Sequence, residues 1–253
     1  MKINEVRAVI TGGASGLGFA TAAHIIKHGG KAVLLDVQDD KGEAAAMALN
    51  AHYFRTDVTD EAGVVASIEA AASAMGGLNV AINCAGILGA GRVLGKTGAM
   101  PLSSFEAAVR INLVGSFNVA KAAAARMQNN LAGEDSERGV IINTASVAAF
   151  EGQIGQAAYA ASKAGVVGMT LPMARELGRF GIRVMTIAPG VFWTPMVDGM
   201  TPEVQASLSA AVPFPARLGQ PDEFADAVAF VLQNRYLNGT VIRLDGAVRL
   251  AAK

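Results

Sequence analysis

The chain has 253 residues, of which 21 are basic and 21 acidic, so its formal net charge is zero. This balance argues against a surface built to bind nucleic acid or an anionic membrane. Hydrophobic residues make up 52% of the chain but aromatic residues only 6%, and there are 29 glycines. Such a composition is typical of parallel strands, alanine-rich helices and tight turns. We expect one domain over residues 1–253.

The single cysteine, Cys84, cannot form a disulfide within the chain, which favours a reducing compartment. No apolar run approaches the roughly 20 residues of a membrane-spanning helix, and no targeting pattern precedes the first apolar strand. We therefore expect a soluble, cytoplasmic protein that does not associate with membranes.

Short apolar runs alternate with helix-forming segments along the whole chain. Strands are expected over residues 7–11, 32–36, 52–55, 78–83, 140–143, 182–188 and 240–244, and helices over residues 16–28, 41–49, 60–75, 104–127, 157–177 and 221–233. This alternation predicts an α/β fold, a Rossmann-type doubly wound parallel sheet of about seven strands with helices on both faces.

Three connections are longer than is usual between strands and helices. Residues 84–103 and 191–220 follow the carboxyl ends of expected strands, where open parallel sheets bind their ligands. We expect both to line a substrate cleft. Residues 129–138 lead into a strand instead, so we expect them at the opposite edge of the sheet.

A glycine-rich turn, Thr11-Gly-Gly-Ala-Ser-Gly-Leu-Gly18, follows the first expected strand and opens the first expected helix. In such a turn the absence of side chains and the free amides at the helix start allow the backbone to bind a pyrophosphate. The turn therefore predicts a dinucleotide site, with contacts at Gly12, Ser15, Gly16, Leu17 and Gly18.

Asp36 ends the second expected strand, at the position from which an acid binds the adenine ribose of a dinucleotide. A 2′-phosphate there would meet like charge, at a cost of about 4 kcal/mol per charge pair at contact. Asp36 therefore predicts NAD over NADP. Lys41 is the nearby cation that would oppose this preference, and we expect it to be a solvated residue at a helix start. Asp57 and the Val58 backbone, after the third strand, are placed to meet the adenine.

Ser146 follows the expected strand at residues 140–143, and Tyr159 and Lys163 are spaced i and i+4 on the next helix, so they share one face. A lysine ammonium about 4 Å away would supply on the order of 4 kcal/mol at an effective dielectric near 20. That is enough to bring the pKa of a tyrosine from about 10 to roughly 7. The three residues predict proton transfer at an alcohol oxygen, which Ser146 would hold by a hydrogen bond. A Tyr-x-x-x-Lys pair alone recurs by chance in many helices, so the other motifs have to support this interpretation.

Together these motifs resemble the short-chain dehydrogenase/reductases over essentially the whole chain. The resemblance is carried by the glycine turn, Asn83-Cys-Ala-Gly86, Asn112 in Asn-Leu-Val-Gly, Ser146, Tyr159 with Lys163, and Pro189-Gly190 before Thr194. Residues 139–158, 182–190 and 241–247, and a glycine-rich insertion at 88–102, are most similar to family members that act on 3-hydroxyacyl-CoA. The resemblance implies an NAD-dependent oxidoreductase that interconverts 3-hydroxyacyl-CoA and 3-oxoacyl-CoA, assembled as a homotetramer.

The resemblance also implies roles for individual residues. Tyr159 would be the acid and base, Lys163 would bind the nicotinamide ribose and lower the pKa of the tyrosine, Ser146 would orient the substrate oxygen, and Asn112 would hold a water of a proton relay. Further contacts, with the nicotinamide end, the ribose or the substrate, are implied at Phe192, Thr194, Cys84 (through its backbone) and Gln153.

Two features depart from the resembled pattern. Trp193 occupies a position that is small in those family members, within a loop expected to cover the substrate, and we hypothesise that it favours short or branched acyl chains. Arg92 and Lys96 in the insertion either meet the phosphates of CoA or are solvated loop charges, and the sequence leaves both interpretations open.

Other functions remain as alternatives. A 3-oxoacyl-carrier-protein reductase would normally favour NADPH, against which Asp36 argues, and a broad-specificity alcohol or hydroxysteroid dehydrogenase would share the same catalytic residues. A dinucleotide-sensing or scaffold protein would keep the glycine turn without needing Ser146, Tyr159 or Lys163. We expect no metal site, because His24 and His28 form a pair without a third ligand motif.

Overall fold

The structure, a computed structural model, describes residues 1–96, 98–199 and 201–252. Seven parallel strands form one sheet in the order β3-β2-β1-β4-β7-β8-β9. Their bounds are β1 (Arg7–Thr11), β2 (Lys31–Asp36), β3 (His52–Arg55), β4 (Val80–Asn83), β7 (Gly139–Thr144), β8 (Ile182–Pro189) and β9 (Val241–Leu244). Strands β7 and β8 are buried at every position, as expected of parallel strands covered on both faces. The expected Rossmann-type sheet is confirmed.

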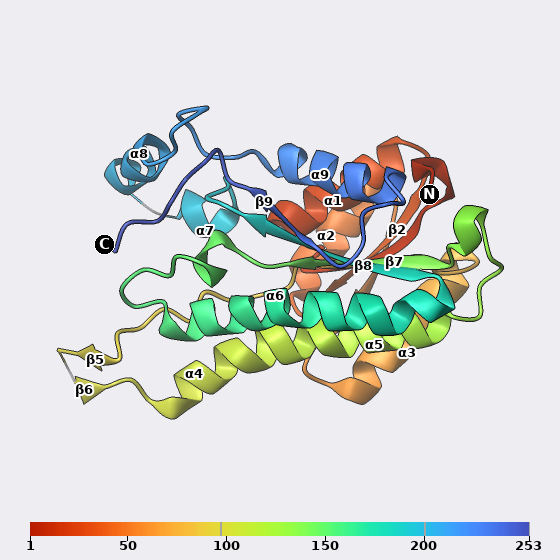
Figure 1. Ribbon diagram of the computed structural model, residues 1–253, viewed down its shortest axis with the longest axis horizontal. Coiled ribbons are helices and arrows are strands. Elements are labelled where there is room, and N and C mark those ends of the chain that lie inside the picture. The colour runs from red at the N-terminus through yellow and green to blue at the C-terminus, as the bar shows by residue number, and fades with distance from the viewer. Residues whose placement is uncertain (97, 200, 253) are drawn as a thin grey trace.

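Helices cover both faces of this sheet (Figure 1). One face carries α1 (Gly16–Lys27), α2 (Asp39–Leu49) and α9 (Pro221–Gln233), and the other carries α3 (Glu61–Met75), α5 (Ser116–Met127) and α6 (Ala157–Leu177). Successive side chains of a strand point to opposite faces. Val9 of β1 accordingly packs in the core under α3, α5 and α6, whereas Ile10 packs in the core under α1, α2 and α9.

The single helix expected over residues 104–127 is interrupted in the structure. It consists of α4 (Leu102–Val109), a π-helical turn (Arg110–Gly115) and α5. Asn112 lies in this turn, and its backbone carbonyl accepts a hydrogen bond from the Ser116 hydroxyl at 2.7 Å. Wider turns of this kind are frequent at functional sites, because they redirect one side chain without ending the helix.

The three long connections lie where they were expected. Residues 84–103 contain a small antiparallel hairpin of β5 (Leu94–Gly95) and β6 (Gly98–Ala99), and residues 191–220 contain α7 (Pro195–Asp198) and α8 (Pro202–Ala210). Asn130 donates hydrogen bonds to the carbonyls of Leu78 and Arg138, just before β4 and β7 begin. The 129–138 connection therefore lies at the amino ends of the strands.

Short 3-10 turns complete the structure, at Ile3–Glu5, Glu134–Ser136, Val147–Ala149 and Gly178–Phe180. Within the described residues, no helix has both the length and the apolar character that crossing a membrane would require.

The carboxyl ends of β1, β2, β4, β7 and β8 meet at one edge of the sheet. That edge brings together the glycine turn, Asp36 and the residues after β7.

Candidate active site

The glycine turn between β1 and α1 is packed too closely for side chains at two positions. A Cβ atom on Gly18 would overlap the carbonyl oxygen of Gly12, and one on Gly12 would lie 2.9 Å from the Ala85 backbone nitrogen. Gly16 has a φ of +53°, a conformation that favours glycine. Ser15 precedes α1 and makes no side-chain capping bond, so the first amides of the helix remain available for an anion. The turn therefore fits a pyrophosphate.

Asp36 lies beside this turn and is 8% exposed. One carboxylate oxygen accepts a hydrogen bond from the Ala14 amide at 3.2 Å, and the other accepts from the amides of Val37 and Gln38 at 2.8 and 3.2 Å. These bonds fix the carboxylate at the rim of the turn. A sugar hydroxyl fits this acceptor, whereas a phosphate would meet its negative charge.

The structure also places a cation here that the sequence interpretation missed. Arg55 of β3 is the register partner of Asp36, and its guanidinium donates to the Val37 carbonyl at 2.9 Å and to Asp39 at 2.7 Å. Only strand pairing brings it there, because it is far from Asp36 in sequence. Lys41 is exposed and donates to the Gln38 side chain at 2.9 Å, consistent with the expected solvated position.

Asp57 is exposed after β3, and its carboxylate accepts hydrogen bonds from the Thr59 amide and hydroxyl, both at 2.8 Å. These bonds lower the pKa of Asp57. The carboxylate thus shapes the turn into α3. Val58 is buried, and its carbonyl accepts a bond from Asn118 at 3.0 Å. Contact of Asp57 and Val58 with an adenine remains a prediction.

Ser146 and Tyr159 meet beyond the end of β7. The Ser146 hydroxyl accepts a hydrogen bond from the Ala148 amide at 3.1 Å, which anchors it at the start of a 3-10 turn. Burial raises the pKa of Tyr159, and a hydrogen bond with Ser146 opposes this rise. Desolvation of the phenol therefore dominates its pKa in this structure, and the expected lowering of the tyrosine pKa by Lys163 remains a prediction.

Lys163 lies behind the tyrosine and is 5% exposed. Its ammonium nitrogen is 5.9 Å from the centroid of the Tyr159 ring and donates to the Thr144 carbonyl at 2.7 Å. Burial lowers the pKa of Lys163 to about 8. Lys163 is thus a buried side chain that is held by a backbone carbonyl beside the tyrosine ring. The structure therefore brings the three predicted catalytic groups together.

Asn112 is fully buried, and its side chain makes three hydrogen bonds. Its oxygen accepts from the Ile87 amide at 2.8 Å, and its nitrogen donates to the Ile87 carbonyl and the Ser162 hydroxyl, both at 2.9 Å. The side chain therefore fixes the segment after β4 against α6. Its expected role in holding a relay water remains a prediction, and both side-chain donors are already used.

Cys84 follows β4, and its amide donates to the Thr11 backbone and hydroxyl oxygens, both at 3.2 Å. Its thiol accepts a bond from the Thr144 hydroxyl at 3.5 Å. Burial raises the pKa of the thiol to about 11, which makes it a packed and unreactive group. The backbone of Cys84 lies beside the glycine turn, where a contact with the cofactor was expected.

The segment after β8 folds toward the glycine turn. The Phe192 side chain is buried edge-on against Phe224, with ring centroids 6.5 Å apart, and its contact with the nicotinamide end remains a prediction. The Thr194 methyl group lies over Gly16, 3.6 Å from where a Cβ on that glycine would be. Trp193, 39% exposed, lies between them in the chain. Thr194 is therefore close to the expected cofactor.

Gln153 lies in the loop between Ser146 and Tyr159 and shares a hollow of about 500 Å³ with Arg92, Val93 and Leu94 of the insertion. The two segments are joined by a hydrogen bond from the Gly91 amide to the Gly155 carbonyl at 2.8 Å. The structure thus brings Gln153, the expected substrate contact, close to Arg92, one of the two candidate CoA-binding cations. Lys96, the other candidate, is exposed farther along the insertion.

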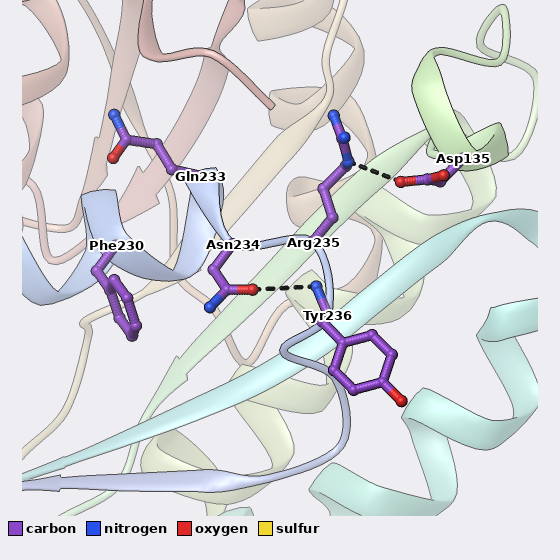
Figure 2. Close-up of a pocket in the computed structure, with 6 residues that line it drawn as sticks. All are labelled: Asp135, Phe230, Gln233, Asn234, Arg235 and Tyr236. Carbon is purple, nitrogen blue, oxygen red and sulfur yellow. Dashed lines mark hydrogen bonds and ion pairs between the residues drawn. The ribbon is translucent and has the colours of Figure 1, made fainter.

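A larger hollow of about 760 Å³ lies far from this edge (Figure 2). It is formed at the end of α9 and by Asp135, near the amino ends of β7 and β9, and Arg235 crosses it to pair with Asp135 at 2.8 Å.

His24 and His28 stack with their ring centroids 4.3 Å apart. Across the described residues, no group of three or more His, Cys, Asp or Glu side chains is arranged to hold a metal ion.

Comparison with known proteins places this site in a family. A sequence model of the short chain dehydrogenase family matches residues 6–205. The chain is 51% identical over 247 residues to a 3-hydroxyacyl-CoA dehydrogenase type-2 of Bos taurus, covering 96% of this chain and 95% of that one. It is 47% identical over 252 residues to a protein of the same name from Drosophila melanogaster, covering 98% and 99%.

A solved structure of a protein with the same name is also similar to this chain. The crystal structure of a 3-hydroxyacyl-CoA dehydrogenase type-2 from Mycobacterium avium matches with a TM-score of 0.93 and 45% identity, over 98% of this chain and 97% of that one. The family implies a nicotinamide dinucleotide, which the glycine turn fits. The chain therefore belongs to the short-chain dehydrogenase/reductase family and is an oxidoreductase.

Proposed function

We propose that this enzyme interconverts 3-hydroxyacyl-CoA and 3-oxoacyl-CoA with NAD. The observation that carries the proposal is the meeting of Ser146, Tyr159 and Lys163 beside the glycine turn, at the edge where the sheet binds ligands. The similarity to proteins named 3-hydroxyacyl-CoA dehydrogenase type-2, at about half identity over nearly the whole chain, supports the choice of substrate.

A dinucleotide held by the glycine turn and Asp36 would supply the hydride chemistry that interconverts the alcohol and the ketone. Tyr159 then exchanges a proton with the substrate oxygen, and the Ser146 hydroxyl donates a hydrogen bond to that oxygen. Burial raises the pKa of Tyr159, so the phenol keeps its proton at neutral pH and is ready for ketone reduction. Lys163 contributes positive charge behind the phenol, which stabilises its anion during alcohol oxidation.

The preference for NAD over NADP rests on Asp36. Its carboxylate is fixed by three backbone amides at the rim of the turn, and Arg55, the neighbouring cation, is paired with Asp39. A ribose hydroxyl can donate a hydrogen bond to the Asp36 carboxylate. A 2′-phosphate would instead be repelled by the negative charge of this carboxylate, and the positive charge of Arg55 is already paired with Asp39.

Assembly as a homotetramer is part of the proposal. The apolar side chains of Val114 in the π-helical turn, Phe117 of α5 and Leu171 of α6 are each more than 40% exposed, and β9 is only half-buried at the edge of the sheet. A second copy could cover each surface. Light scattering after size exclusion tests the homotetramer, and a monomer would contradict it.

We also propose a cytoplasmic location, with which the single cysteine is consistent.

Steady-state kinetics of the purified protein test the activity. The substrates are NADH or NADPH with acetoacetyl-CoA, a longer 3-oxoacyl-CoA and a simple ketone. We expect turnover of the CoA esters with NADH. Removal of the general acid in Tyr159→Phe should lower kcat by about a thousandfold while NADH binding, followed by fluorescence, is retained. Near wild-type turnover by this variant would refute the proposed role of Tyr159. Turnover of the simple ketone without turnover of the CoA esters would refute the proposed acyl-CoA substrate.

A further inference from the structure

The last described residues of the chain run beside the loop between Ser146 and Tyr159 (Figure 1). The Ala252 carbonyl accepts a hydrogen bond from the Ile154 amide at 3.0 Å, and the Ala251 carbonyl accepts one from the Gln153 side chain at 3.1 Å. These bonds join segments about 98 residues apart. The loop that carries the expected substrate contact is therefore held from outside the catalytic helix.

Ion pairs strengthen this junction. Arg243 of β9 donates two parallel hydrogen bonds to the Glu151 carboxylate, at 2.8 and 3.0 Å, and a third to Asp245 at 2.8 Å. Arg249 pairs with both acids, at 3.4 and 3.2 Å. The side chains of Arg243 and Glu151 are only 24% and 25% exposed, and a forked pair of this kind fixes orientation as well as distance.

The same segment also contacts the second connection that borders the cleft. The Gly190 amide donates to the Leu244 carbonyl at 2.9 Å, and a Cβ on Gly190 would lie 2.9 Å from the Asp245 Cα. Gly190 leads directly into Phe192 and Thr194. Residues 243–252 therefore lie between the 150–156 loop and the start of the 191–220 connection, and contact both.

We propose that Arg243 and Glu151 are positioning residues for substrate selection, which fix the 150–156 loop through the C-terminal segment (residues 243–252). This inference rests on the proposed function. Ser146 is anchored by the Ala148 amide and Tyr159 belongs to α6, so neither depends on the ion pair. Loss of the pair therefore moves Gln153 and its neighbours while it leaves the proton-transfer groups in place.

The decisive variant is Glu151→Gln, which keeps the size of the side chain and removes its charge. We expect KM for a 3-oxoacyl-CoA to rise by about fivefold or more, because a displaced contact loop weakens substrate positioning. We expect kcat and KM for NADH to stay within about twofold. Glu151→Asp should restore part of the KM, because it keeps the carboxylate. Glu43→Gln, an exposed change on α2, is the matched control.

Hydrogen exchange provides a readout that does not need activity. The Ile154 amide, bonded to Ala252, should exchange about tenfold faster in Glu151→Gln and in Arg243→Lys than in the Glu43→Gln control. If wild-type protein does not turn over 3-oxoacyl-CoA, the proposed function fails, while the exchange experiment still decides whether the ion pair holds the loop. Unchanged Ile154 exchange in both variants, or a fall in kcat with unchanged KM, would overturn the inference.

Discussion

The ammonium nitrogen of Lys163 lies 5.9 Å from the centroid of the Tyr159 ring and is hydrogen-bonded to the Thr144 carbonyl. Burial shifts both groups toward their neutral forms, because it raises the pKa of the phenol and lowers that of the ammonium to about 8. At neutral pH the tyrosine therefore keeps its proton, next to a lysine whose charged form is disfavoured by burial.

The two directions of the reaction should differ in their dependence on pH. Alcohol oxidation needs the Tyr159 phenolate, so kcat/KM for a 3-hydroxyacyl-CoA with NAD should rise by about tenfold per pH unit below the tyrosine pKa. Ketone reduction needs the phenol and should show no such rise. Profiles from pH 6 to 10 in both directions measure this. Oxidation that is independent of pH over this range would contradict the role of Tyr159 as base.

Lys163→Met should make the protein without cofactor more stable at neutral pH. The folded pKa of about 8 lies below the 10.5 of an exposed lysine, so between these values the unfolded chain binds the extra proton and stability rises with pH. Below pH 8 the buried charge costs on the order of 3 kcal/mol. Removal of the buried charge in Lys163→Met should therefore raise the free energy of unfolding. Loss of the hydrogen bond to Thr144 offsets about 1 kcal/mol of this gain, so the variant should be more stable than wild type by about 2 kcal/mol.

Urea unfolding at pH 7 and at pH 10 measures the effect. The advantage of Lys163→Met over wild type should be largest at pH 7 and should shrink toward pH 10, where wild-type Lys163 is neutral in the folded state. Lys41→Met, at an exposed lysine of α2, should change stability little at either pH. A Lys163→Met protein that is less stable than wild type at pH 7 would show that the buried charge is compensated.

Asp36→Asn should relax the choice of cofactor. Asparagine keeps an acceptor for the Val37 amide but removes the charge that repels a 2′-phosphate, and it leaves Arg55 nearby. We expect the ratio of kcat/KM for NADPH to that for NADH to rise by about tenfold. Asp40→Asn, an exposed neighbour on α2, serves as the control. A wild-type protein that uses both cofactors equally would remove the basis of this prediction.

Trp193→Gly tests whether the exposed indole limits the acyl chain. Removal of a large apolar side chain from the covering loop should raise kcat/KM for long 3-oxoacyl-CoAs by about tenfold and change that for acetoacetyl-CoA little. A series of substrates of increasing chain length, assayed with NADH, gives the comparison. An unchanged dependence on chain length would mean that Trp193 points away from the acyl group.

The sequence by itself determined the alternation of strands and helices, the glycine turn, Asp36 at the end of its strand and the shared helical face of Tyr159 and Lys163. Each of these follows from local spacing and backbone preference, which act over a few residues. Parallel pairing with right-handed crossovers then allows few arrangements of the sheet, so its topology and the edge that carries the site could be predicted as well.

Only the tertiary structure decided the features that depend on contacts distant in the chain. The π-helical turn at Asn112 is tied to Ile87 and Ser162, 25 and 50 residues away, and Arg55 reaches Asp36 through strand pairing alone. The pKa shifts of Tyr159 and Lys163 come from burial, which spacing along a helix cannot express. The attachment of Gln153 to the end of the chain likewise arises from packing, because no local pattern encodes which distant segments will meet.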